Sequence, residues 1–205
     1  MHYDTSVRFI YRAEGSPARL GILAGSFNPP TRAHLALLEA AAAGEVDEVL
    51  CVIPRVFPHK IYHGASLDDR LAMLEAARPA APCSIAVSEG GLFTDIAREC
   101  RDAYAGAPDL LFLCGRDAAE RIVYWDYGDA SAIDRMFEHF SLLVAARQGR
   151  FEPPVHLAHR VRNLEVPGDL DEISSTEVRE RIRNGEPWEH LVPAGIVDHV
   201  RRIYR

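Results

Sequence analysis

Lysine is almost missing from this sequence, since Lys60 is the only lysine among the 23 basic residues. A Walker A loop needs a lysine that Ser or Thr follows, and Lys60 is followed by Ile61. A protein-kinase core built on a Val-Ala-Ile-Lys strand is excluded for the same reason. The HExxH and GxSxG motifs of metalloproteases and serine hydrolases are absent as well.

Long apolar runs, paired cysteines and net positive charge are also lacking. No run approaches the roughly 20 apolar residues of a membrane span, and the first residues lack the apolar core of a signal peptide. The four cysteines form no CxxC pair, which favours reduced thiols in a cytoplasmic protein. The formal charge of −7 argues against nucleic acid or a membrane as a partner bound by bulk charge. An anionic small molecule needs only a few local cations.

The chain has 205 residues, enough to bury a full core without disulfide or metal support. Its short apolar runs show no alternation, which is typical of parallel strands buried on both faces. Strands are predicted at 20–25, 48–54, 83–89, 109–115, 140–147 and 161–166, and helices at 33–43, 67–77, 95–104 and in pieces up to 137. This alternation predicts an α/β fold with a doubly wound, mainly parallel, Rossmann-like sheet, which binds ligands at the carboxyl ends of its strands.

The two ends of the chain depart from this alternation. Residues 175–185 begin with Ser and Thr and end with Gly, which predicts a helix, and a second short helix is predicted at 194–204. We therefore expect residues 19–205 to form a single domain with a small helical C-terminal segment over about 170–205. Two alternatives stay open for residues 1–18, an N-terminal arm or an edge strand over Val7–Tyr11.

The most informative segment is GSFNPPTRAH at 25–34, between a predicted strand and a predicted helix. Gly25 and Ser26 allow the backbone to approach a ligand closely. The helix start that follows offers free N–H groups and a positive dipole end, both suited to phosphate. Thr31 and His34 are three residues apart and share a helix face, so the imidazole is expected to point at the same phosphates.

This segment resembles the nucleotide-binding motif of the nucleotidyltransferase superfamily, Gly-x-Phe-x-Pro-x-(His/Thr)-x-x-His. Within it, the sequence is most similar to the nicotinate/nicotinamide mononucleotide adenylyltransferases. ISSTEVR at 173–179 resembles the family's Ile-Ser-Ser-Thr-x-x-Arg motif, which binds ATP phosphates. Hydroxyls, helix-start amides and a forked cation suit that role physically. An ordinary capped helix would explain the ISSTEVR segment alone, and its pairing with the first motif favours the family.

Further segments resemble the family more weakly. Pro58-His59-Lys60 is similar to its Pro-x-His-Lys loop, and LVP at 191–193 to its closing segment. Gly115-Arg116-Asp117, with Trp125 eight residues beyond the aspartate, matches a Gly-x-Asp and Trp arrangement. In the family the aspartate contacts nucleotide and the tryptophan stacks on the pyridine ring. The alternatives are an exposed loop cation for Lys60 and a half-buried core side chain for Trp125.

The stretch GGLFTDIARE at 90–99 departs from the family. Many members carry Ser-Tyr-Thr-x-Asp-Thr there, in contact with the pyridine substituent, and only Phe93 and Thr94 partly replace it. The choice between nicotinate and nicotinamide mononucleotide therefore stays open.

The resemblance implies an enzyme of NAD biosynthesis that transfers the adenylyl group of ATP to a pyridine mononucleotide and releases pyrophosphate. Mg²⁺ is implied as a cofactor bound through the phosphates, with no metal ligands from side chains. The partners implied are ATP and the mononucleotide, and a homo-oligomer is compatible with the sequence. Two alternatives remain: a nucleotidyltransferase of the same superfamily with a different phosphorylated acceptor, and a non-catalytic nucleotide-binding protein.

The resemblance also assigns residues. Catalytic roles are implied for His34, Thr31, Lys60 and Arg179. ATP-binding roles are implied for Gly25, Ser26, Phe27, His34, Gly115, Asp117, Ile173, Ser174, Ser175, Thr176 and Arg179. Mononucleotide-binding roles are implied for Asn28, Lys60, Phe93, Thr94 and Trp125.

Overall fold

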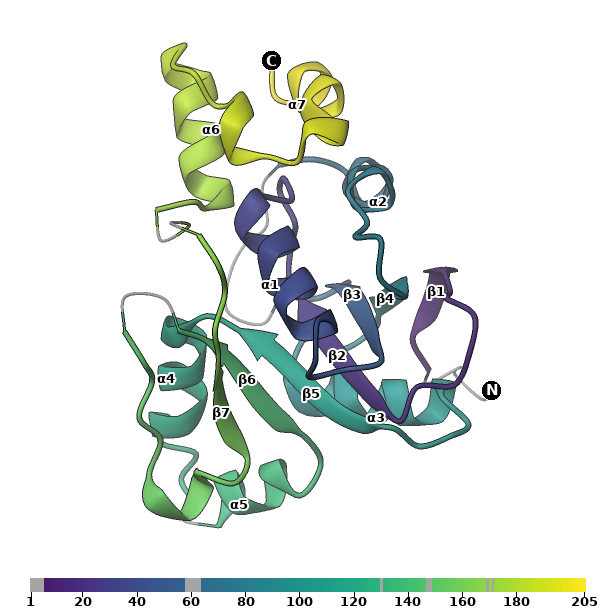
Figure 1. The fold of residues 1–205 in the computed structure, drawn as a ribbon, viewed down its shortest axis with the longest axis vertical. Helices are drawn as coiled ribbons and strands as arrows, with labels where there is room; N and C mark the ends of the chain where they lie inside the picture. The colour runs from purple at the N-terminus through teal and green to yellow at the C-terminus, as the bar shows by residue number, and fades with distance from the viewer. Residues whose placement is uncertain (1–5, 58–63, 130, 147–148, 169, 171) are drawn as a thin grey trace.

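The computed structural model of the chain describes residues 6–57, 64–129, 131–146, 149–168, 170 and 172–205. One sheet has the strand order β1-β4-β3-β2-β5-β6-β7 (Figure 1). The strands are β1 (Arg8–Tyr11), β2 (Arg19–Ala24), β3 (Glu48–Pro54), β4 (Cys83–Ser88), β5 (Asp109–Cys114), β6 (Ser141–Ala145) and β7 (Val161–Leu164). Only the β1–β4 pair is antiparallel among these neighbours. The predicted α/β fold with a mainly parallel sheet is confirmed.

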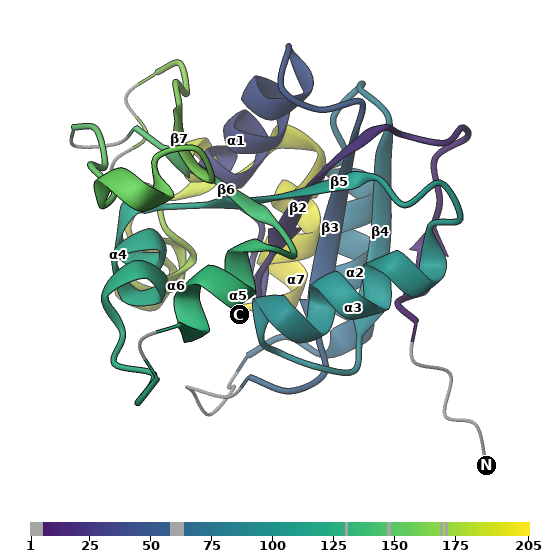
Figure 2. The same cartoon turned by 90° about the horizontal axis from the view of Figure 1, so that it is seen from below.

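Helices cover both faces of this sheet. They are α1 (Arg32–Ala42), α2 (Leu67–Ala76), α3 (Phe93–Ala103), α4 (Arg116–Tyr124), α5 (Ala132–Phe137), α6 (Ser175–Asn184) and α7 (Val197–Ile203), with short 3₁₀ turns at Val155–Leu157, Glu189–Leu191 and Ala194–Ile196. One core cluster joins the sheet to α3, α4 and α5, and a second joins its other face to α1 and α2. Figure 2 shows α3 and α5 on the opposite side of the sheet from α1.

The central strands are buried on both faces, as their unbroken apolar sequences predict. Every residue of β3 is buried. Leu50 and Val52 pack into the cluster with α3, whereas Val49 and Cys51 pack into the cluster with α1. Successive side chains of a strand point to opposite faces, so a strand in this position needs apolar residues throughout.

The strand order places a topological switch point between β2 and β5. From β2 the chain proceeds outward through β3 and β4, then crosses back to β5 and proceeds outward in the other direction through β6 and β7. The loops that follow β2 and β5 therefore leave the sheet at the same edge and diverge. In open α/β sheets this is where ligands bind.

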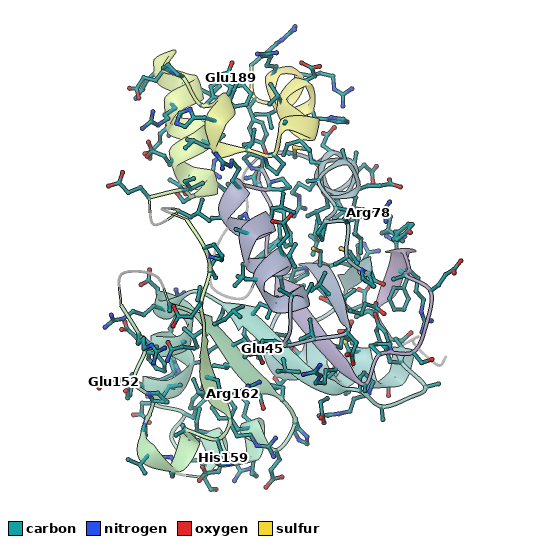
Figure 3. The ribbon with its side chains drawn as sticks, in the orientation of Figure 1. Glu45, Arg78, Glu152, His159, Arg162 and Glu189 are labelled. Carbon is teal, nitrogen blue, oxygen red and sulfur yellow. The ribbon has the colours of Figure 1, made fainter. Side chains whose placement is uncertain are left out.

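The C-terminal segment forms a cluster of its own beside α1 and α2 (Figure 1). Apolar side chains from α6, α7 and the turns between them pack with Met73 of α2. An ion pair of 3.1 Å between Arg201 Nη2 and Glu189 Oε1 joins α7 to the turn at Glu189–Leu191, and Figure 3 labels Glu189 there. The two predicted C-terminal helices are thus present as α6 and α7.

The N-terminal segment contributes the edge strand, one of its two predicted alternatives. β1 pairs with β4, and the Ala13 N–H beyond it donates to Ser84 Oγ at 2.9 Å. The ring of Phe9 contacts that of Tyr104 edge-on, with centroids 5.5 Å apart. The guanidinium of Arg78, labelled in Figure 3, lies 3.6 Å from the ring centroid of Tyr11.

Candidate active site

The loop after β2 forms the floor of the site. The Gly25 N–H donates to the Val52 carbonyl at 3.0 Å, so the β2–β3 pairing continues into the loop. Phe27 is buried and has a φ of 47°, in the left-handed region that costs a non-glycine residue roughly 1–2 kcal/mol. Its ring centroid lies 5.2 Å from that of His34. The surrounding contacts therefore hold this backbone conformation in place.

Thr31 and His34 form a reciprocal cap at the start of α1. The Thr31 N–H donates to His34 Nδ1 at 3.0 Å, and Thr31 Oγ1 accepts from the His34 N–H at 3.5 Å. Because Nδ1 accepts a hydrogen bond here, the ring proton of the neutral imidazole is assigned to Nε2. The Nε2–H of a neutral His34 is then a hydrogen-bond donor near a helix start, where anions are favoured.

The start of α6 contacts this same loop. Ser175 Oγ donates to the Pro29 carbonyl at 2.7 Å. Arg179 Nη1 donates to the Asn28 carbonyl at 2.6 Å and to the Ser175 carbonyl at 3.0 Å. Two segments that are far apart in the sequence are therefore held together by direct hydrogen bonds. Two helix N-termini, those of α1 and α6, meet at the loop after β2.

The other members of the second motif complete the start of α6. Ser174 is the N-cap, and its Oγ accepts from the Glu177 N–H at 3.1 Å. Arg179 Nη2 donates to Thr176 Oγ1 at 3.3 Å. Ile173 is half-buried and packs against the C-terminal cluster. Ser174 and Thr176 are exposed at the helix start, and their contact with ATP phosphates stays a prediction.

Asn28 occupies the centre of the loop and is buried. Its Oδ1 accepts from the Ala65 N–H at 3.2 Å and from the Tyr204 hydroxyl at 2.5 Å. A Cβ at Gly64 would lie 2.2 Å from Asn28 Nδ2, and Gly64 has a φ of +145°, so only glycine fits there. The amide oxygen is engaged within the protein, and a contact of Asn28 with the mononucleotide stays a prediction.

Arg70 is a contact of the loop that the sequence analysis missed. It lies on α2, is 5% exposed, and donates from Nη1 to the Ser26 carbonyl at 3.1 Å and from Nε to the Ser66 carbonyl at 3.3 Å. A buried guanidinium beside a ligand loop adds positive charge where its screening by water is weak. In the sequence, Arg70 follows two aspartates on a predicted helix, a pattern that indicates an exposed face.

Gly115 and Asp117 lie on the other side of the switch point, after β5. Gly115 follows β5, which pairs with β2, and is the N-cap of α4. Asp117 is exposed in the first turn of that helix. Trp125 follows the last residue of α4 and is 57% exposed. Trp125 and Gly115 flank this helix and are ten residues apart, so they lie about 15 Å from each other along its axis.

Most of the stretch at 90–99 is helical, because α3 begins within it. α3 begins at Phe93, two residues before the predicted start, because Asp95 Oδ2 accepts from the Leu92 N–H at 3.3 Å. The Phe93 ring stacks on Phe112 with centroids 4.3 Å apart, so it belongs to the core of the sheet. Thr94 is half-buried in the first turn of α3. Contacts of either residue with the mononucleotide stay predictions.

Buried Glu99 anchors the backbone just before α3, a role that the sequence did not indicate. Its two carboxylate oxygens accept from the Glu89 N–H at 3.0 Å and the Gly90 N–H at 2.8 Å. These amides follow β4, at the same edge of the sheet as the loop after β2.

Lys60, the predicted phosphate-binding lysine, lies outside the described residues.

The described residues bear on metal and membrane partners. They contain no group of three or more His, Cys, Asp or Glu placed to hold a metal ion. They also contain no helix that is both long and apolar enough to span a membrane.

A hollow of about 520 Å³ lies on the outer side of α1, and Ile173 is the predicted site residue that lines it.

Comparison with known proteins identifies the family. The model of the cytidylyltransferase-like family matches residues 22–181. A protein of Acidothermus cellulolyticus described as a probable nicotinate-nucleotide adenylyltransferase is 34% identical over 93% of this chain and 96% of its own length. A relative of the same description from Moorella thermoacetica is 30% identical over 92% and 93%. The chain belongs to the nicotinate-nucleotide adenylyltransferase family.

The fold of the family is seen in a solved structure as well. Plasmodium falciparum nicotinic acid mononucleotide adenylyltransferase, complexed with NaAD, superposes with a TM-score of 0.66 at 18% identity. The match covers 90% of this chain and 95% of that one. Membership makes this chain a nucleotidyltransferase, as its two motifs predicted. The first motif and β5 with the start of α4 fall inside the matched region, together with most of α6.

Proposed function

We propose that this chain transfers the adenylyl group of ATP to nicotinate mononucleotide, which yields the dinucleotide and pyrophosphate in NAD biosynthesis. One observation carries the proposal: Ser175 and Arg179 of α6 bind the backbone of the loop that leads into α1. This contact holds the start of α6 against the loop that leads into α1, which supports a site shared by both motifs. A triphosphate needs such a convergent set of N–H, O–H and guanidinium donors.

The chemistry follows from the charge of the reactants. The phosphate of the mononucleotide is already ionised near neutral pH, so its oxygen attacks the α-phosphorus of ATP without a general base. The P–O bond to the β-phosphate breaks, and pyrophosphate leaves with the electron pair. Catalysis then depends on positioning and on neutralising charge at the phosphates.

In this proposal, different residues bind different phosphates of ATP. Nε2–H of His34 donates to the α-phosphate, with Thr31 holding the ring in place. Arg179 and the start of α6 bind the β- and γ-phosphates, joined by Lys60. Gly25, Ser26 and Phe27 shape the loop beneath them. Gly115 and Asp117 contact the nucleotide, and Trp125 the pyridine ring.

Mg²⁺ is proposed to enter with ATP and to be held by phosphate oxygens and water, the coordination that this ion prefers. Donors around the loop are N–H groups and hydroxyls, and Asp117 is the one carboxylate among the proposed ATP-binding residues. Bound there, the ion would offset negative charge on the phosphates. We also propose the cytoplasm as the compartment, in keeping with four buried free cysteines.

The test is a direct assay of the purified chain with ATP, Mg²⁺ and either nicotinate or nicotinamide mononucleotide, with pyrophosphate and dinucleotide both measured. We expect turnover with nicotinate mononucleotide and a lower kcat/KM with the amide. If the amide has the higher kcat/KM, the acceptor is corrected to nicotinamide mononucleotide. If neither acceptor yields a dinucleotide while ATP binds, the proposed acceptor is wrong.

A further inference from the structure

The Tyr204 hydroxyl contacts the nucleotide loop from the C-terminal segment. It donates to Asn28 Oδ1 at 2.5 Å, and Asn28 is 3% exposed. The Ala65 N–H donates to the same oxygen at 3.2 Å. A backbone N–H must donate to an acceptor, so this bond fixes which end of the Asn28 amide is the oxygen. The tyrosine hydroxyl is therefore the donor to a charge-neutral, buried acceptor, where a hydrogen bond is strong.

The backbone of Asn28 connects this contact to the phosphate-binding residues. Its carbonyl oxygen accepts from Arg179 Nη1 at 2.6 Å, and the next carbonyl, that of Pro29, accepts from Ser175 Oγ. The side chain of Asn28 is thus held by Tyr204 and its main chain holds Arg179. A shift of the Asn28 side chain would move the carbonyl that fixes the guanidinium.

Tyr204 is itself held by the C-terminal cluster rather than by the site. Its N–H donates to the Val200 carbonyl at 3.0 Å, and its ring packs against the buried cluster that includes Val200, Ile196 and Met73. The ring and the hydroxyl therefore have separable tasks. The ring contributes to packing, and the hydroxyl reaches into the loop.

We propose that Tyr204 is a positioning residue of the nucleotide site: its hydroxyl fixes the Asn28 amide, and through it the loop carbonyl that orients Arg179. The expected effect of Tyr204 on the kinetics rests on the proposed function. The expected effect on ATP binding rests only on the contact proposed between Arg179 and the phosphates of ATP, which does not depend on the acceptor. A misplacement of such a group affects rate more than stability.

The experiment is a double-mutant cycle of Tyr204→Phe and Arg179→Lys. Phenylalanine keeps the ring and removes the hydroxyl. We expect Tyr204→Phe to lower kcat/KM for ATP about ten-fold in the wild-type background and less than two-fold in the Arg179→Lys background. Affinity for a non-hydrolysable ATP analogue, measured by calorimetry on the same four proteins, should show the same non-additivity.

The outcomes separate the two proposals. If the wild type makes no dinucleotide, the proposed function fails, and the calorimetric cycle still decides the role of Tyr204. If Tyr204→Phe stays within two-fold of wild type, or has the same effect in both backgrounds, the positioning role is overturned. The binding stoichiometry reports the folded fraction, so a partly unfolded variant remains interpretable. Tyr11→Phe, on edge strand β1, is the matched control and should match wild type.

Discussion

His34 carries two tasks on one ring, and they can be separated by substitution. Nδ1 accepts the Thr31 N–H and caps α1, whereas Nε2 is assigned to the α-phosphate. We expect His34→Ala to lower kcat at least ~10²-fold, as for the loss of a transition-state donor. It should also cost about 1 kcal/mol of unfolding free energy, because the Nδ1 half of the reciprocal cap is lost. Steady-state kinetics and urea unfolding measure the two effects.

His34→Asn is the matched variant for this test. Its amide oxygen can take the place of Nδ1 and accept the Thr31 N–H, but it has no atom at the place of Nε2. Stability should return towards that of the wild type while kcat stays low. A recovery of kcat together with stability would show that the ring acts through the cap alone.

At single positions, the sequence indicates the candidate donors more clearly than the residues that support the loop. Thr31, His34, Ser175 and Arg179 are recognisable because motif spacing places them at helix starts. The roles of Arg70 and Glu99 depend on backbone groups that lie 44 and 9 or 10 residues away, and no local pattern encodes such contacts. The sequence does not show that Arg70 and Glu99 are buried, because their burial depends on partners that only the fold brings around them.

Among the elements, the amino ends of β3 and β4 share a buried polar network. Glu48 Oε1 accepts from Ser84 Oγ at 2.6 Å and from the Tyr104 hydroxyl at 2.7 Å. Ser84 Oγ also accepts from the Ala13 N–H, which ties the segment after β1 to the sheet. The network lies at the end of the strands opposite the site, so it stabilises the fold without touching the chemistry.

We therefore expect Ser84→Ala to lower the unfolding free energy by about 1–3 kcal/mol, since the part-buried Ala13 N–H and the buried Glu48 carboxylate each lose a partner. kcat/KM should stay within two-fold of wild type. Ser141→Ala, at the start of β6, serves as the control and should change stability by less than about 0.5 kcal/mol. Urea unfolding with parallel assays checks this, and a large loss of activity in folded Ser84→Ala would contradict it.

Most elements were predictable because their signals are local. A strand buried on both faces is apolar throughout, and the prediction at 48–54 coincides with β3. α6 has Ser174 at its N-cap and Gly185 at its end, with a φ of +71° that suits glycine. β1 was left undecided because four residues at a sheet edge carry too short a pattern. Its strand state depends on pairing with β4, more than 70 residues away.

The whole molecule is expected to lose stability at alkaline pH. Burial raises the pKa of the Cys114 thiol from 9.0 to about 12, and burial also raises the pKa values of Cys100 and Tyr104 well above their ordinary values. Between pH 9 and 12 the unfolded chain loses the Cys114 proton while the folded chain keeps it. Stability therefore falls as pH rises, by about 1.4 kcal/mol per pH unit for this thiol.

Guanidinium unfolding between pH 7.5 and 10.5 measures this decline. For Cys114→Ala, the unfolding free energy should fall less steeply with pH above pH 9, because one titrating group is gone. Leu113→Ala, on the same strand, should lower stability at every pH and leave the slope as in wild type. Equal slopes in wild type and Cys114→Ala would mean that this thiol does not contribute.

The joining of the loop after β2 to α6 also has a consequence for biosynthesis. The bonded residues are separated by 146 and 151 positions, and together they form the site that we propose. A ribosome that adds 5–20 residues per second needs roughly 7–30 s to pass from the first partner to the second. Over that interval β2 and α1 can pair with their neighbours, but the nascent chain has no place for a triphosphate. Nucleotide binding is therefore acquired late, after the sheet has been synthesised, and cannot assist its assembly during translation.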